Sequence, residues 1–285
     1  SSEYKSHIFP AKNPKNYQIS MIEHMFETFN IPSLYLCDQG YLSLYSAGLD
    51  TCTVLYIGEG VTHSTSFYEG YSLSTIAQKI GGIDVSNFLL KLMNESGYSF
   101  LTGADKLIIK AITEKICYVA LNYDEELNKA KTSSACDSIY TLPDGNRILI
   151  HNQRFRCGEL LFNPYLEGFE YDGVHSIVYN SINKCDFDLR PKLYSNILLS
   201  GGSTKFKGFS ERLVKEIKKL VLPGTQVNII SNPNSDYAAW IGGSIFASKD
   251  VFKDLAFTYE QYKENGPVSR NVDNSLIYEK FYFTE

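Results

Sequence analysis

Apolar and polar positions change their spacing several times along the chain, and the clearest change lies within residues 196–220. The short apolar run at 196–199 is typical of a strand buried on both faces. Gly201 and Gly202 follow, and paired glycines permit backbone angles that are closed to other residues. A helical apolar face then begins, formed by Leu213, Ile217 and Leu220. The pattern predicts a strand, a glycine turn and a helix.

The same two spacings predict the other elements. Helices are expected around residues 21–29, 40–45, 84–93, 108–119, 174–182, 188–194 and 236–245. Strands are expected at 34–37, 51–56, 61–68, 147–150 and 226–230. A Gly-x-Gly turn separates the runs 51–56 and 61–68, so they are predicted to form a hairpin. Strands that alternate with helices favour an α/β architecture.

Glycine turns are the candidate binding features of this sequence. The turns at Gly58-Glu59-Gly60 and at residues 200–203 could each present backbone N–H groups to a phosphate. The alternative is that both are tight connections without a ligand, and the residues alone leave this open. The chain has no Walker-type loop, dinucleotide fingerprint or Gly-x-Ser-x-Gly motif. No catalytic constellation follows from spacing alone.

Composition narrows the class of partner. Hydrophobic residues make up 44% of the 285 and charged residues 21%, as in a soluble globular protein. The net charge of -5 and a pI near 5.6 argue against general binding of nucleic acids or anionic membranes. No apolar run reaches the length of about eighteen residues that a membrane span needs. We expect neither a nucleic acid nor a membrane as partner.

Cysteine and histidine usage points to a reducing compartment and to no metal site. The six cysteines are dispersed, with no Cys-x-x-Cys pair, and are typical of small buried residues. The five histidines show no metal-ligand spacing. The first residues also lack the apolar core of a signal peptide. We expect the cytoplasm.

Short segments along nearly the whole chain resemble the actin family, in the same order. They are residues 25–30, 42–45, 60–63, 68–71, 97–100, 117–121, 142–145, 154–157, 179–182, 199–202 and 240–244. The resemblance implies the α/β fold shared by actin, sugar kinases and Hsp70-type ATPases, incomplete at the N-terminus. It implies a partial subdomain one (1–46 and 238–285), no subdomain two, subdomain three (47–80 and 170–237) and subdomain four (81–169).

The resemblance also implies a nucleotide site for ATP or ADP with magnesium. Gln39 and His63 match the family residues that position the hydrolytic water. The matching nucleotide contacts are Gly58, Glu59, Gly60, Val61, Gly82, Glu114, Gly201, Gly202 and Phe206. Glu59 replaces an aspartate of the family, and Phe206 replaces a tyrosine.

Other departures from the family remove charge from this site. Tyr56 stands where the family has a metal-associated aspartate, and no metal ligand is assigned. Thr113 and Asp236 stand where it has lysines beside the nucleotide. Fewer cations weaken polyphosphate binding, and phosphoryl transfer depends on magnesium. The sequence therefore predicts weak or absent ATP binding and negligible ATPase activity.

The resemblance finally implies a partner cleft between subdomains one and three. Its matching residues are Tyr45, Gly70, Tyr71, Phe246 and Leu255, while Asp50, Lys249 and Val251 alter its chemistry. Glu167 sits at the apolar tip of the loop that resembles the hydrophobic plug of actin. A carboxylate at a buried contact opposes self-polymerisation.

These observations predict an actin-like cytoskeletal protein of the cytoplasm, with actin or actin-binding proteins as partners. The alternative is a non-polymerising actin-related interaction subunit of a larger, multi-subunit assembly. A third hypothesis is a fragmentary gene product without a stable function, whose exposed half-core would favour aggregation. A metabolic sugar kinase shares the fold class, but none of its substrate residues is recognisable in this sequence.

Overall fold

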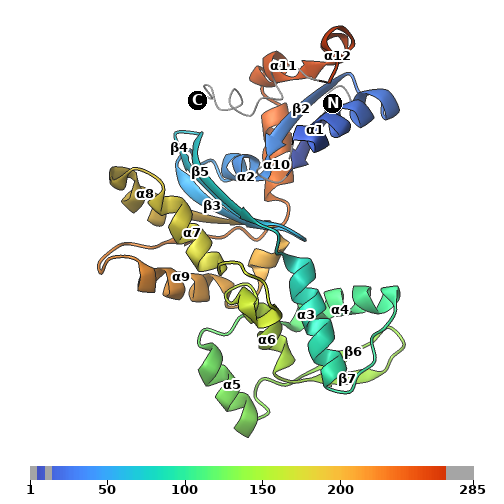
Figure 1. Ribbon diagram of the computed structural model, residues 1–285, viewed down its shortest axis with the longest axis vertical. Helices are drawn as coiled ribbons and strands as arrows, with labels where there is room; N and C mark the ends of the chain where they lie inside the picture. The colour runs from blue at the N-terminus through green and yellow to red at the C-terminus, as the bar shows by residue number, and fades with distance from the viewer. Residues whose placement is uncertain (1–4, 10–14, 268–285) are drawn as a thin grey trace.

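The computed structural model describes residues 5–9 and 15–267, and a mixed five-stranded sheet lies at its centre (Figure 1). Its strand order is β5-β4-β3-β8-β9. The strands are β3 (Cys52–Ile57), β4 (Thr62–Tyr68), β5 (Tyr71–Gln78), β8 (Ile197–Ser200) and β9 (Ile229–Ile230). β3, β4 and β5 pair antiparallel, whereas β8 runs parallel to both β3 and β9. The predicted hairpin and the strand predicted at 196–199 are confirmed.

Helices cover both faces of this sheet. On one face Ser64 of β4 contacts Ser181 of α7 (Val174–Asn183), with 2.7 Å between the hydroxyl oxygens. On the other, Ser200 of β8 contacts Ser43 of α2 (Gln39–Ser46), also at 2.7 Å. Side chains alternate along a strand, so the neighbour of Ser64, His63, faces the α2 side. This burial on both faces explains the apolar run of β8.

A second, separate sheet has three strands in the order β1-β2-β10. Its members are β1 (Lys5–Phe9), β2 (Ser33–Asp38) and β10 (Phe257–Thr258). Helix α1 (Lys15–Glu23) precedes β2 and continues into a π-helical turn at His24–Thr28. The strand predicted at 34–37 and the helix predicted at 21–29 are therefore present, although the helix begins earlier.

Helix α10 (Ala238–Ala247) packs against α2 through its small residues. A Cβ on Gly242 would lie only 1.8 Å from the carbonyl oxygen of Leu42, so the two backbones approach very closely. The short helices α11 (Val251–Leu255) and α12 (Tyr259–Asn265) follow. The helix predicted at 236–245 is therefore confirmed, and its small residues allow this close contact.

The third part of the chain, residues 81–169, is mainly helical. It contains α3 (Gly82–Glu95), α4 (Gly103–Ile116), α5 (Tyr123–Thr132), β6 (Ser138–Thr141), β7 (Arg147–Ile150) and α6 (Gln153–Glu159). The side chain of Thr102 accepts a hydrogen bond from Asp105 N, and Asp105 accepts one from Thr102 N, so α4 begins with a capping box.

Several elements differ from the sequence prediction, in extent or because they were missed. α4 ends at Ile116, so Val119 does not continue its face. The acidic run 124–126 opens α5, which the apolar pattern missed because this helix has no buried residue. β5 was also missed, since most of its residues are only partly buried. Of the strand predicted at 226–230, only Ile229–Ile230 pairs.

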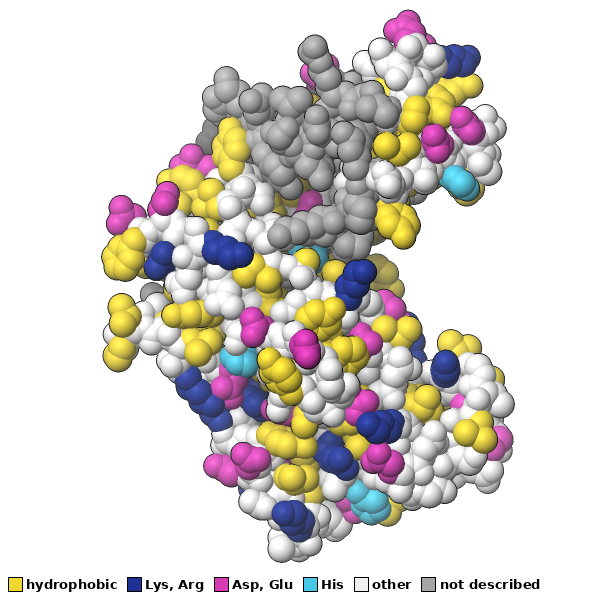
Figure 2. Space-filling view, viewed as in Figure 1, with side chains coloured by type: hydrophobic (Ala, Val, Ile, Leu, Met, Phe, Trp, Pro, Cys, Tyr) yellow, Lys and Arg dark blue, Asp and Glu magenta, His cyan; other side chains and the backbone are white. Residues whose placement is uncertain are grey.

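The helix predicted after Gly201 and Gly202 is α9 (Phe209–Leu220). Helix α8 (Arg190–Tyr194) precedes β8. Figure 2 shows that the molecule is hollowed between the part that carries α1 and the part that carries α3 and α4. The carboxyl ends of β3 and β8 and the start of α3 lie toward this hollow (Figure 1). The glycine turns predicted to bind a ligand therefore lie at one end of the strands of the central sheet, where β3 and β8 finish.

Candidate functional site

Three glycine-containing segments meet where the central sheet ends and α3 begins. Gly58 O accepts hydrogen bonds from Gly82 N at 2.9 Å and from Ser203 Oγ at 3.4 Å. Glu59 O accepts one from Ile83 N at 2.8 Å. The turn after β3, the start of α3 and the turn after β8 are thus joined directly, although they are far apart in the sequence.

Only glycine fits at Gly201, whereas the close contact at Gly82 is with a side chain that can rotate away. Gly201 has a φ of 86°, and a Cβ there would lie 2.3 Å from Ile57 O. A Cβ on Gly82 would lie 2.7 Å from Ser203 Oγ. Positive φ and backbone contact both exclude a side chain at Gly201. The structure therefore brings together three of the glycines predicted for the nucleotide site.

The first N–H groups of α3 are already hydrogen-bonded within the protein. Gly82 N and Ile83 N donate to the β3–β4 turn, and Asp84 N donates to Gly81 O at 3.1 Å. The carboxylate of Asp84 in turn accepts from Gly81 N at 2.8 Å. Free N–H groups are what makes a helix N-terminus an anion site. In this arrangement, these three donors of α3 are not available to a phosphate.

The two lysines nearest the glycine turns are each paired with an acid. Lys110 Nζ lies 2.9 Å from the carboxylate of Glu59, and Lys205 Nζ lies 3.2 Å from that of Asp236. The hydrogen bond to Glu59 raises the pKa of Lys110. Glu114 lies one helical turn beyond Lys110 on α4 and is exposed. Lys110 and Lys205 are 44% and 46% exposed, so these surface pairs offset part of the positive charge beside the glycine turns.

His63 and Gln39 lie on the α2 side of the sheet, beneath Tyr56. His63 is 0% exposed, and its ring is stacked on that of Tyr56, with centroids 5.0 Å apart and planes at 19°. Neither ring nitrogen of His63 has a hydrogen-bond partner, and neither does Gln39 Oε1. Burial lowers the pKa of His63 to about 4, so the ring is neutral at pH 7.

Asp38 is a site residue that the sequence analysis missed. Its carboxylate caps α2 by accepting hydrogen bonds from Gly40 N at 2.7 Å and Tyr41 N at 3.2 Å. Burial raises the pKa of Asp38 to about 6, although these hydrogen bonds oppose the shift. An aspartate directly before the helical stretch 40–45 is a helix-start signal that could have identified it.

The remaining nucleotide positions contribute no charge. Thr113 is buried, and its hydroxyl donates to Ile109 O in its own helix at 2.8 Å. Phe206 is partly buried and packs against the main hydrophobic core. Val61 O accepts the hydrogen bond from Gly58 N at 3.0 Å that closes the β3–β4 turn. Gly60 is exposed in the same turn, and Gly202 is exposed beside Asp236.

The residues predicted for the partner cleft fall into two groups. Tyr45 contacts Phe246 edge to face at 5.7 Å, and Leu255 packs against the same cluster. Phe246 is only 1% exposed, so its side chain belongs to the core of the protein. Gly70 lies in the β4–β5 turn, with a φ of 81°, and Tyr71 is the first residue of β5. A partner role for these residues stays a prediction.

Searches for other site types gave no candidate within the described residues. No group of three or more His, Cys, Asp or Glu side chains in residues 5–9 and 15–267 could hold a metal ion. Over the same residues, no helix is long and apolar enough to cross a membrane. The six cysteines are buried and free.

The fold and the junction define an α/β protein whose glycine turns lie at the carboxyl ends of two parallel strands. Ligands of open α/β sheets bind outside the carboxyl ends of their strands. The family model for actin matches residues 8–273. The chain belongs to the actin family, which confirms the resemblance seen in its short segments. Proteins of this family generally bind ATP or ADP with magnesium.

Proposed function

We propose that this chain is a cytoskeletal actin-family protein of the cytoplasm whose ATP cleft is inherited but degraded. The observation that carries the proposal is the pairing of Lys110 with Glu59 and of Lys205 with Asp236. A polyphosphate is held mainly by charge-assisted hydrogen bonds, so it would have to displace both carboxylates. Asp236 also adds repulsion beside Gly202. The glycine framework supports descent from a nucleotide site, and the charges oppose a triphosphate.

Magnesium-ATP does not fit the residues that are present. Tyr56 offers no carboxylate at the position where the family holds one near the metal. The first donors of α3 are consumed by Gly58 and Glu59. Magnesium sites use carboxylates together with phosphates, and phosphoryl transfer depends on the bound ion. We therefore derive no hydrolytic step, and the predicted ATPase activity of these 285 residues is negligible.

Titration calorimetry with magnesium-ATP tests the charge argument. We expect no saturable binding by the wild-type chain below roughly 1 mM. The double variant Glu59→Gln/Asp236→Asn frees Lys110 and Lys205, and it should bind magnesium-ATP at least about tenfold more tightly. Micromolar affinity of the wild-type protein would contradict the proposal.

A control variant removes an acid that pairs with a lysine farther from the glycine turns. Glu167 pairs with Lys91 at 2.8 Å, and Lys91 lies nine residues after Gly82 on α3. Nine helical residues span about 14 Å, which is too far for direct contact with a ligand at the glycine turns. Glu167→Gln should therefore leave the affinity for magnesium-ATP unchanged. A gain equal to that of the double variant would mean that overall charge is responsible.

The second candidate function is a non-polymerising interaction subunit of a larger assembly, and the geometry of Glu167 favours it. The loop predicted as a plug forms a short helical turn, Pro164–Glu167, whose acidic end is bound to Lys91. The hydrogen bond to Glu167 raises the pKa of Lys91. An apolar plug would have to insert free of such charge. The loop is instead held by an ion pair on its own chain.

High-speed sedimentation tests self-polymerisation. Under salt and magnesium conditions that polymerise ordinary actin, we expect the purified chain to remain in the supernatant. The physical reason is the desolvation of Glu167 that a buried plug contact would require. Recovery of filaments in the pellet would contradict this expectation, and electron microscopy would separate filaments from amorphous aggregate.

A further inference from the structure

Tyr56 lies between the β3–β4 turn and His63. A Cβ on Gly58 would lie 2.8 Å from Tyr56 Cε1 and 3.1 Å from its hydroxyl oxygen, so the phenol ring lies against the turn. The ring also stacks on His63 at a centroid distance of 5.0 Å. One aromatic side chain thus fills the space between the glycine turn and the histidine.

The atoms beneath this ring are buried polar atoms without partners. They are Nδ1 and Nε2 of His63 and Oε1 of Gln39. Burying a polar atom without a hydrogen bond is unfavourable, so each such atom in a folded protein calls for an explanation. The burial is explained by the stacked ring on one side and by α2 on the other. Gly40 of α2 approaches His63 so closely that a Cβ there would lie 3.4 Å from Cε1.

The groups around Tyr56 keep its phenol protonated, and a protonated phenol does not favour a metal-bound phosphate beside it. Burial raises the pKa of the Tyr56 phenol; a hydrogen bond with the Gln39 side chain opposes this shift and the Asp38 carboxylate adds to it, so the hydroxyl stays protonated. A protonated phenol is a weak ligand for magnesium, which prefers carboxylate, phosphate and water oxygens. The ring also stacks on one face of the imidazole of His63, between it and the glycine turn.

We propose that Tyr56 is a specificity-determining residue that covers Gln39 and His63 and excludes a metal-bound phosphate from them. It acts by occupying space rather than by charge. The water-positioning pair inherited from the family is then present but covered. This inference concerns the same cleft and rests on the proposed function, but a different experiment tests it.

The rate of chemical modification of His63 measures how well Tyr56 shields this histidine from solvent. Diethyl pyrocarbonate carbethoxylates an accessible neutral imidazole: a ring nitrogen attacks a carbonyl carbon, and ethyl carbonate leaves. In the folded wild-type chain, we expect His63 to react at least about tenfold more slowly than the exposed His24, because a covered group reacts only after local opening. Tyr56→Val keeps a good strand former but removes the ring, and it should bring His63 within about threefold of His24.

Tyr56→Phe is the matched control, because it keeps the ring and removes only the hydroxyl. His63 should remain as protected in it as in the wild type. Cooperative thermal unfolding shows whether each variant is folded, and Tyr56→Leu replaces Tyr56→Val should the latter fail to fold. A wild-type His63 that reacts as fast as His24 overturns the proposal without any variant.

Magnesium pyrophosphate tests the exclusion itself. In the Glu59→Gln/Asp236→Asn background, where Lys110 and Lys205 are free, it should slow carbethoxylation of His63 by about threefold or more when Tyr56→Val is added, and it should not change the rate when Tyr56→Phe is added instead. Absence of this protection would leave Tyr56 as a packing residue and would overturn its role in specificity. Failure of the proposed function looks different, since it appears as micromolar binding of magnesium-ATP by the wild-type chain.

Discussion

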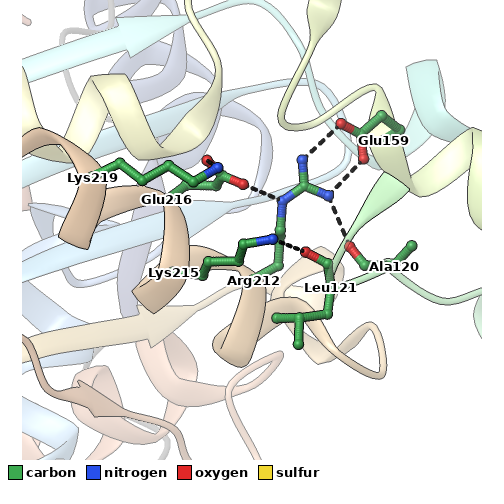
Figure 3. Close-up of polar contacts among 7 residues, drawn as sticks. All are labelled: Ala120, Leu121, Glu159, Arg212, Lys215, Glu216 and Lys219. Atoms are coloured by element: carbon green, nitrogen blue, oxygen red, sulfur yellow. Dashed lines mark hydrogen bonds and ion pairs between the residues drawn. The ribbon is translucent and has the colours of Figure 1, made fainter. Parts of the chain in front are cut away.

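Replacing Arg212 with methionine should destabilise the protein by about 3–5 kcal/mol, because it leaves a buried carboxylate without its partner. Arg212 is 8% exposed and Glu159 is 5% exposed. Two nitrogens of the guanidinium donate to the two oxygens of Glu159, each at 2.9 Å (Figure 3). The same guanidinium donates to Ala120 O at 2.8 Å and to Glu216 at 2.7 Å.

This network joins α9 to α6 and to the segment after α4, so it connects parts of the chain that local structure does not connect. Urea unfolding at pH 7 would measure the free energy of unfolding. The double variant Arg212→Met/Glu159→Met removes both buried charges, and it should recover at least about 2 kcal/mol relative to Arg212→Met alone.

Lys215 provides a matched control on the same helix. Its Nζ donates to Leu121 O at 3.0 Å across the same junction (Figure 3). Unlike Arg212, this side chain is only partly buried. Lys215→Met should change the free energy of unfolding by less than about 1 kcal/mol. If Arg212→Met had an equally small effect, the buried ion pair would not stabilise this junction.

Replacing Gly242 with alanine should cost about 3 kcal/mol, although alanine normally favours a helix interior over glycine. The new Cβ would lie 1.8 Å from Leu42 O and 2.7 Å from Leu42 C, both backbone atoms of α2. Backbone atoms cannot move aside by changing a rotamer, so the helices α2 and α10 would have to separate. Gln39 is the first residue of α2, so this separation would also shift a predicted site residue.

Thermal and urea unfolding of Gly242→Ala would measure this cost. Ser244→Ala is the control, because Ser244 lies on the exposed side of α10 and should change stability by no more than about 0.5 kcal/mol. A stabilising effect of Gly242→Ala would show that α2 and α10 are not in close contact.

Much of the fold follows from local patterns. The β3–β4 hairpin could be predicted because two β-rich runs flank Gly58-Glu59-Gly60. α10 could be predicted as a helix rich in small residues. α5 could not, since none of its residues is buried and an exposed helix leaves no apolar period. β5 was missed for the related reason that most of its side chains are only partly buried.

The candidate site was predictable only in part. The resemblance identified Gln39, His63 and the glycines as a set, and the structure places the turns of Gly58, Gly82 and Gly201 side by side. It did not indicate that Lys110 pairs with Glu59, because these residues are fifty-one positions apart and a side-chain contact depends on how α4 lies against the turn. The same holds for Lys205 and Asp236.

The sequence by itself determined the family and those local elements that have a clear apolar period or a glycine turn. Strand, glycine turn and helix at 196–220 depend on neighbouring residues, and collinear segments extend along nearly the whole chain. Only the tertiary structure decided that Tyr56 lies over His63, because β3 and β4 must pair in register before these side chains stack. It also decided that Asp38 is buried at the start of α2. Chain order fixes which groups exist, whereas packing fixes which of them are covered, paired or available to a ligand.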